Sequence, residues 1–151
     1  IPALRRLNLS SCHNITSVAA LRLCDRLHTV NLSGCQGVTN AAVLGQCGSI
    51  QSLRISHMQC TNSDVEVLSH MASLQELSLT HCQSVTDVSP LSKCRQLRTL
   101  DLSYCNKLTA VSTLTGCKSL SRVTLWGCTS VSDAEGLVGH VAHVSTGHPS
   151  A

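Results

Sequence analysis

The chain has 151 residues, of which 42% are apolar and only 13% charged, and it contains no phenylalanine. Its net charge of +3 is weak, and no cluster of five Lys or Arg residues occurs, so nucleic-acid binding is not indicated. No apolar run approaches the roughly 18 residues of a membrane-spanning helix. With so few aromatic side chains, Leu, Val, Ile and Cys must fill the interior, which suits a narrow repeated core better than a single large one.

One pattern of leucines recurs six times along the chain and is clearest in residues 97–108, LRTLDLSYCNKL. Successive units are offset by 23, 23, 24, 23 and 23 residues. A period of this length predicts a solenoid, in which each unit forms one coil and stacking buries what a single coil cannot. The leading positions are Leu4, Leu27, Ile50, Leu74, Leu97 and Leu120.

Each unit predicts one short strand and one short outer segment. Alternation, as in Leu100-Asp101-Leu102, predicts a strand with one buried face. The outer segment is expected to be one or two helical turns, partly 3₁₀, and to be longer in the third unit, over residues 62–68. Ser89-Pro90 also fits the start of such a segment. Its expected N-caps are Thr16, Thr39, Thr61, Thr86, Thr109 and Ser132.

We therefore predict an α/β solenoid of six units of about 23 residues over residues 1–144. A parallel sheet would line the concave face, and short α or 3₁₀ segments the convex side. Residues 145–151, rich in Ser, Thr, Gly, His and Pro, are predicted to be a loose tail. Because neither end carries a capping segment, we expect a fragment whose ends are covered by flanking parent domains or by a partner.

The ten cysteines follow the repeat. Met58 and Met71 replace cysteine in the two columns, which indicates that these sites require a small or soft buried side chain. No C-x-x-C pair suggests zinc or redox chemistry, so we predict structural thiols, with no metal or cofactor, in a reducing intracellular compartment such as the cytoplasm. At the bend after each strand, a thiol can also donate weakly to backbone groups. The first column holds Cys12, Cys35, Cys82, Cys105 and Cys128, the second holds Cys24, Cys47, Cys94 and Cys117, and Cys60 stands apart.

These units resemble leucine-rich repeat proteins of the cysteine-containing subclass, known from substrate-recognition subunits of F-box ubiquitin ligases. Residues 82–87, CQSVTD, carry that subclass's signature. Residues 86–91, TDVSPL, resemble repeats of trypanosome expression-site-associated leucine-rich proteins and of bacterial internalins, and the 23-residue period fits this kinetoplastid-like form best. The resemblance covers residues 3–140 and implies a solenoid that binds protein.

The residues between the strand leucines are expected to point outward, where a protein partner would bind. Most are Ser, Thr or Asn, so the larger and charged side chains are the candidates for partner binding. Trp, Tyr and Arg dominate binding hot spots because they bury much area with little loss of rotamer freedom. A Trp near the last unit can also serve as a packing residue there. The candidates are Arg54, Glu76, Asp101, Tyr104, Arg122 and Trp126.

His57 and His81 occupy one column of successive units, near Arg54. Stacked imidazoles can begin a metal site or a pH-sensitive site. The alternative is that both are simply exposed histidines in turns.

No motif of an enzyme occurs: the chain lacks G-x-S-x-G, a P-loop and H-E-x-x-H. Cysteines assigned to the interior lack the exposure that a reactive thiolate needs. We therefore expect a non-enzymatic protein-interaction module, with substrate recognition for a ubiquitin ligase as one version. The alternative is a structural scaffold component of a large assembly, such as a flagellar or ribonucleoprotein complex.

Overall fold

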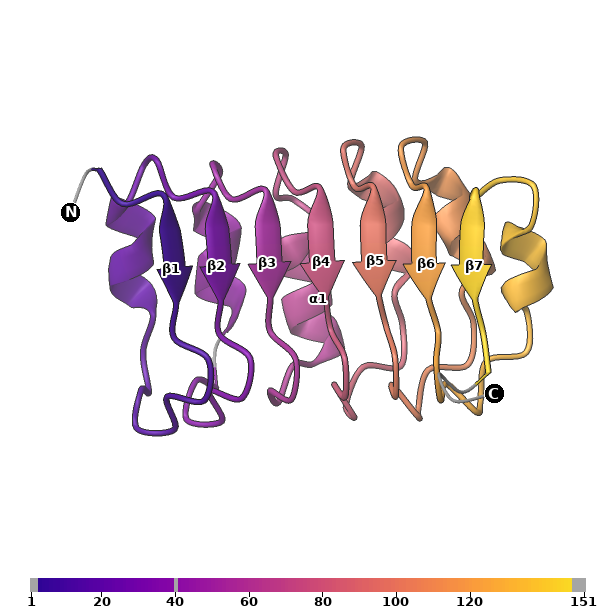
Figure 1. Cartoon of the computed structure of the whole chain (residues 1–151), viewed down its shortest axis with the longest axis horizontal. Helices are drawn as coiled ribbons and strands as arrows, with labels where there is room; N and C mark the ends of the chain where they lie inside the picture. Colours follow the sequence, from indigo (N-terminus) through magenta and orange to yellow (C-terminus); the bar gives the residue numbers. More distant parts are fainter. Residues whose placement is uncertain (1–2, 40, 148–151) are drawn as a thin grey trace.

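The computed structural model describes residues 3–39 and 41–147. Within them, seven short parallel strands form one open sheet in chain order, from β1 to β7 (Figure 1). The predicted alignment of the repeats is confirmed, because Leu77 pairs with Leu53 on one side and with Leu100 on the other. The strands are β1 (Arg6–Asn8), β2 (Thr29–Asn31), β3 (Ser52–Arg54), β4 (Glu76–Ser78), β5 (Thr99–Asp101), β6 (Arg122–Thr124) and β7 (His143–Ser145).

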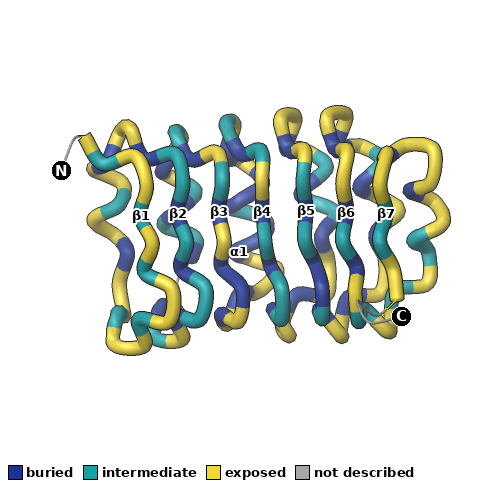
Figure 2. The backbone as a smooth tube through the Cα atoms, viewed as in Figure 1, coloured by how far each residue is buried: buried dark blue, intermediate teal, exposed yellow. Residues whose placement is uncertain are grey.

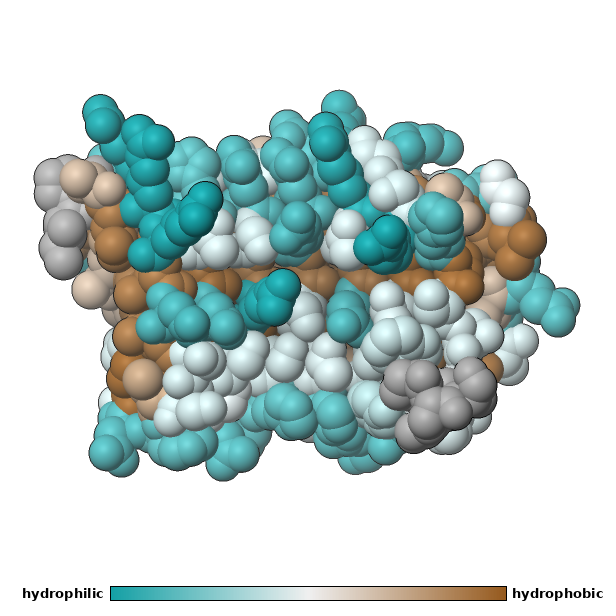
Figure 3. Space-filling model, viewed as in Figure 1, coloured by the Kyte–Doolittle hydropathy of each residue, from teal (hydrophilic) through white to brown (hydrophobic). Residues whose placement is uncertain are grey.

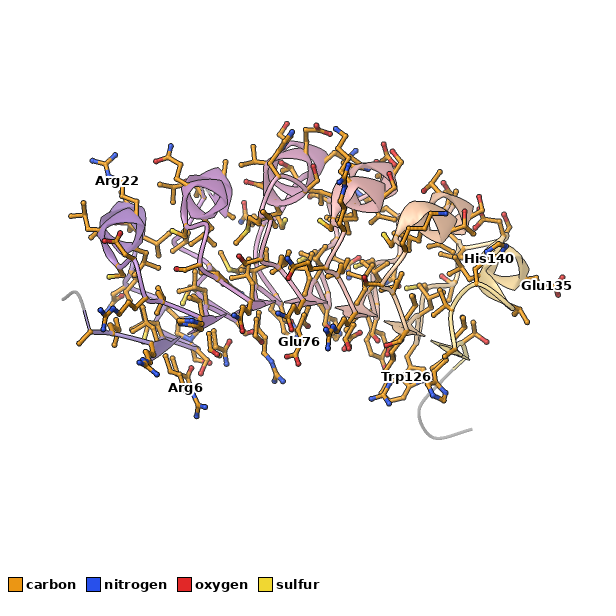
Figure 4. All side chains as sticks on the ribbon, turned by 90° about the horizontal axis from the view of Figure 1, so that it is seen from above. Arg6, Arg22, Glu76, Trp126, Glu135 and His140 are labelled. Carbon is orange, nitrogen blue, oxygen red and sulfur yellow. The ribbon has the colours of Figure 1, made fainter. Side chains whose placement is uncertain are left out.

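The sheet is curved, and all helical segments of the described chain lie on its convex side (Figure 4). Five are short 3₁₀ helices, and the longer segment predicted for the third unit is the α-helix of the described residues. The prediction of short, partly 3₁₀ outer segments and the prediction of a longer segment in the third unit are both confirmed. The segments are η1 (Ala19–Leu23), η2 (Ala41–Gln46), α1 (Asn62–Leu68), η3 (Ser89–Lys93), η4 (Ser112–Gly116) and η5 (Ala134–Leu137).

The predicted N-caps are mostly wrong. Only Thr61 directly precedes its helix, α1. The segments η1, η3 and η4 follow valines two residues beyond the predicted Thr, and η5 follows Asp133 rather than Ser132. These valines are buried, so the chain enters the core before the 3₁₀ turn begins. Pro90 does lie in the first turn of η3, but Ser89 is inside that turn rather than before it. The residue before η2 lies outside the described residues.

A single apolar core runs the length of the solenoid between the strands and the outer segments (Figure 2). Each leading position from Leu27 to Leu120 is at most 4% exposed. Leu4, Leu7 and Leu9 are only half-buried, because no coil of the described residues packs on the outer side of the first one. At the other end, Leu125, Cys128 and Val131 line an apolar cavity of about 460 Å³. Both ends of the described solenoid therefore present partly exposed apolar side chains.

The prediction of six units misses a seventh strand. Val141 takes the buried leading position and Val144 pairs with Val123, so the last unit is two residues shorter than the usual period. The tail predicted from residue 145 also begins too early, because Ser145 belongs to β7 and its oxygen accepts a hydrogen bond from Leu125 N at 2.7 Å. Gly147 O accepts one from Gly127 N at 2.8 Å. Residues 148–151 lie outside the described residues.

No helix in the described part of the chain has the length and apolar character that crossing a membrane requires.

Candidate functional site

The concave side of the sheet is not covered by any helix or loop of the described chain (Figures 1 and 4). Two columns of side chains, one from the first and one from the third residue of each strand, project from this concave side. We call the surface that they form the sheet face. Because side chains alternate along a strand, the middle residue of each strand points to the core, and the flanking two point outward. Hydrophilic residues lie on both sides of a narrow hydrophobic band on this face (Figure 3). The first column is Arg6, Thr29, Ser52, Glu76, Thr99, Arg122 and His143, and the second is Asn8, Asn31, Arg54, Ser78, Asp101, Thr124 and Ser145.

The structure brings four of the six predicted partner-binding residues onto the sheet face. Glu76 and Arg122 lie in the first column, while Arg54 and Asp101 lie in the second. Arg54, Glu76 and Arg122 are exposed and Asp101 is half-buried. Glu76 Oε2 accepts a hydrogen bond from Ser52 Oγ at 3.0 Å. None of the four forms an ion pair within the described residues, so their charges remain open to solvent or to a partner.

A shallow groove of about 620 Å³ lies over strands β1 to β4 of the sheet face. This groove contains two of the six predicted partner-binding residues, Arg54 and Glu76, and lies in the N-terminal half of the chain. A smaller depression of about 200 Å³ continues from Glu76 toward Asp101 and Thr124. The first groove contains polar residues that the sequence analysis left out of the site: Arg6, Asn8, Asn31, Gln51 and Gln75. Arg6 could have been predicted from the sequence, because it occupies the same position in its repeat as Glu76 and Arg122 do in theirs.

The remaining two candidates, Tyr104 and Trp126, lie beyond the ends of strands β5 and β6 rather than within the strands. Trp126 follows β6, is 37% exposed and projects on the same side of the molecule as Arg6 and Glu76 (Figure 4). Tyr104 lies in the turn after β5, where its φ of 60° turns the chain. Tyr104 N donates a hydrogen bond to Trp126 O at 2.6 Å, but the Tyr104 ring stacks on His81, with 4.5 Å between ring centroids. Only Trp126 therefore adds a large apolar surface beside the sheet face.

His57, His81 and Tyr104 form a continuous ring stack in successive coils. The His57 and His81 centroids are 4.1 Å apart and their planes are inclined by 16°. Burial lowers the pKa of His81, and the neighbouring His57 lowers it further, while Asp101 partly offsets both effects. His57 is exposed, but His81 is half-buried, so the expectation of two exposed turn histidines holds only for His57. The described residues contain no group of three or more His, Cys, Asp or Glu side chains that could hold a metal ion.

The cysteines form a ladder of free thiols along the core. Cys35 Sγ donates to Leu9 O at 3.0 Å, and Cys105 Sγ donates to Leu79 O at 3.2 Å, so each thiol joins its coil to the preceding one. Cys117 in the second column donates to Leu91 O at 3.0 Å. Burial raises the pKa of Cys105 to about 12 and that of Cys117 to about 11, so both remain protonated at neutral pH. The predicted burial of these unpaired thiols in both columns is thereby confirmed.

Comparison with known proteins agrees with this geometry. Residues 72–116 match the family described as Leucine Rich repeats (2 copies), and residues 2–24 match the family described as Leucine Rich repeat. No curated protein matches the sequence. Together with the parallel sheet and the regular coils, the matches identify the architecture: the chain is a leucine-rich repeat solenoid.

Two similar solved structures are internalins from Listeria monocytogenes str. 4b F2365. Internalin C2 has a TM-score of 0.69 and 24% identity, over 96% of this chain and 72% of that protein. The internalin InlF has a TM-score of 0.78 and 20% identity, over 96% of this chain and 48% of that protein. At these identities the likeness concerns the fold, and this chain spans about half the length of the second protein.

Proposed function

We propose that this chain is a protein-interaction module that binds a protein partner through its sheet face. The observation that carries the proposal is the uncovered concave sheet, on which Arg54, Glu76, Asp101 and Arg122 hold charges without ion pairs in the described residues. Regular coils fix these side chains at strand spacings of about 4.8 Å, so little order has to be gained on binding. Trp126 adds the kind of aromatic surface that dominates many binding hot spots.

The experiment is capture of partners from a cell extract by the immobilised chain, followed by mass spectrometry. Arg122→Ala and Trp126→Ala on the sheet side are compared with Arg22→Ala on the helix side (Figure 4). We expect the two sheet-side variants to lose at least about tenfold of the captured partner and the helix-side variant to retain it. Equal capture by all three folded variants contradicts binding through the sheet face.

Substrate recognition for a ubiquitin ligase is a finer version of this proposal, and the alternative is a structural scaffold component of a large flagellar or ribonucleoprotein assembly. The thiol ladder supports the first role, because it suits the cysteine-containing subclass that the units resemble. The partly exposed apolar ends support the second, since neighbouring domains or subunits would cover them. Affinity purification from cells separates the two. Transient recovery of ubiquitin machinery supports substrate recognition, and stoichiometric recovery of one large particle supports the scaffold.

We also propose that the chain has no enzymatic activity and works in a reducing compartment. Burial raises the pKa of Cys35, Cys47, Cys94, Cys105 and Cys117, which opposes thiolate formation. Labelling of the folded protein with iodoacetamide tests this. One cysteine that reacts much faster than free cysteine would reopen a catalytic role.

A further inference from the structure

The Asx turns at the ends of strands β2 and β5 are built alike but leave different atoms free. Asn31 Oδ1 accepts a hydrogen bond from Ser33 N at 3.0 Å. Asp101 Oδ1 accepts the equivalent bond from Ser103 N, also at 3.0 Å. The turn therefore consumes one acceptor in either residue type. What remains is an amide NH₂ donor at Asn31 and a carboxylate oxygen at Asp101.

Asn8, at the end of β1, repeats the arrangement of Asn31. Its Oδ1 accepts from Ser10 N at 3.0 Å, which fixes the orientation of the amide and leaves Nδ2 as the outward donor. Neither Nδ2 has a hydrogen-bond partner among the described residues. The second column thus presents donors over β1 to β3, where Arg54 follows the two asparagines, and an acceptor over β5.

Arg6 and Arg54 complete the donor-rich part of the sheet face. Both line the 620 Å³ groove together with Asn8 and Asn31, and both are exposed. Neither guanidinium meets a carboxylate in the described residues, since the ion pair found there joins Lys93 to Glu66 on the helix side. Glu76 is the groove's single acid, and Ser52 Oγ already donates to it. The groove therefore holds two guanidinium groups and the side-chain amides of Asn8, Asn31, Gln51 and Gln75, against the one carboxylate of Glu76 at its β4 edge.

We propose that this donor-rich groove binds an acidic segment of a protein partner, with carboxylate side chains accepting from Arg6, Asn8, Asn31 and Arg54. Arginine presents its donors in a planar fork that matches a carboxylate, and charge-assisted hydrogen bonds are about twice as strong as neutral ones. Carboxylates on one face of an extended segment recur about every 6.8 Å, close to the separation of Arg6 and Asn8 along β1. The proposal rests on the proposed function and specifies the chemistry of the partner on that face.

The test uses a fluorescein-labelled twelve-residue peptide of alternating Glu and Ser, followed by fluorescence anisotropy at low salt. We expect saturable binding that weakens on addition of 0.5 M NaCl, about the concentration at which screening acts within a few ångströms. Arg6→Gln combined with Arg54→Gln should weaken binding at least about tenfold. Arg22→Gln combined with Arg95→Gln, which removes the same charge from exposed residues outside the groove, should leave the affinity within about twofold.

Asn31→Asp gives the sharper comparison, because it preserves the turn and replaces one donor by a charged acceptor. We expect it to weaken peptide binding several-fold more than Asn106→Asp, the same change at an exposed loop position after β5. Thermal unfolding confirms that each variant is folded.

Three outcomes overturn the assignment: no saturable binding by the unaltered chain, equal losses in the two Asn→Asp variants, or tighter binding of a single-stranded DNA oligomer than of the peptide. If the peptide fails to bind while Trp126→Ala still abolishes capture of a cellular partner, the proposed function is retained. The proposal that the groove binds an acidic segment is then wrong. If the peptide binds as expected while sheet-side variants capture every cellular partner normally, the wider proposal fails instead.

Discussion

The imidazole ring of His81 lies face to face with that of His57, with 4.1 Å between their centroids. Tyr104 continues the stack on the other side of His81, and all three residues have φ near 60°. The stack therefore depends on a strained backbone position that recurs once per coil. Left-handed backbone is unfavourable for most side chains, and histidine is among the residues that adopt it more often.

The first prediction concerns stability in mild acid. Burial and the His57 ring lower the pKa of His81, despite the opposing effect of Asp101, so the folded state holds His81 neutral to a lower pH than the unfolded chain does. The unfolded chain, with a pKa near about 6.5, takes up the proton first as the pH falls. The free energy of unfolding should therefore be fully retained above about pH 7 and decline as the pH falls through about 6.5 toward the lower native pKa.

Urea unfolding between pH 7.5 and pH 5 measures this effect. His81→Asn keeps a residue that tolerates left-handed backbone but removes the titrating ring, so the decline should become shallower. His140→Asn, which alters an exposed histidine on the helix side, is the control and should leave the decline unchanged (Figure 4). An equal decline in His81→Asn and the unaltered chain would assign the pH effect to other groups.

Gly127 supports the far end of the stack, and the second prediction is that alanine there is destabilising. Gly127 has φ +66°, and a β-carbon at this position would lie 2.4 Å from Cδ1 of Tyr104. Gly127→Ala should lower the free energy of unfolding by about 1–3 kcal/mol, from backbone strain and displacement of the ring.

Two comparisons isolate the cause. In a Tyr104→Ala background the cost of Gly127→Ala should shrink, because the ring it would displace is gone. Gly48→Ala, where a β-carbon meets nothing within 4 Å, should change stability by no more than about 0.5 kcal/mol. A similar cost in both Tyr104 backgrounds would mean that backbone strain alone explains the loss.

The third prediction addresses the thiol ladder. Cys105→Ala removes a buried sulfur and its bond to Leu79 O, and should cost about 1–2 kcal/mol in urea unfolding. The loss is limited because Cys82 N also donates to Leu79 O, which therefore keeps one partner. Cys12→Ala, in the same column of the first coil, should cost less, since Cys12 is half-buried. Equal costs at the two positions would count against a stabilising role for stacking between coils.

The fourth prediction concerns the start of α1. Asp64 is 6% exposed, and its Oδ2 accepts hydrogen bonds from Thr61 N and Thr61 Oγ1, both at 2.8 Å. Asp64→Ala should lower stability by about 1–2 kcal/mol, because it leaves Thr61 N and Thr61 Oγ1 at the helix N-terminus without this acceptor. Glu66→Ala in the same helix breaks an exposed ion pair with Lys93 and should cost less than about 1 kcal/mol. The reverse order would contradict the role of Asp64.

The sequence by itself determined the architecture. The leucine period fixed one coil per unit, and the alternation around Leu100 fixed which strand residues face the core, because a side-chain period of two allows no other arrangement against a buried face. The replacement of cysteine by Met58 correctly indicated buried, unpaired thiols. The longer outer segment in the third unit was also visible as one additional residue in the period.

Only the tertiary structure decided the helix starts, the last strand and the make-up of the site. Buried Val88 and Val111 moved the 3₁₀ turns past the predicted caps, since burial of a valine outweighs a local cap. β7 forms although its sequence lacks the leucines, because β6 offers free backbone groups and a core edge to pair with. Tyr104 joined a histidine stack rather than the sheet face, and the donor-rich groove arose from Asn8 and Asn31, whose free atoms depend on turn hydrogen bonds between nearby residues.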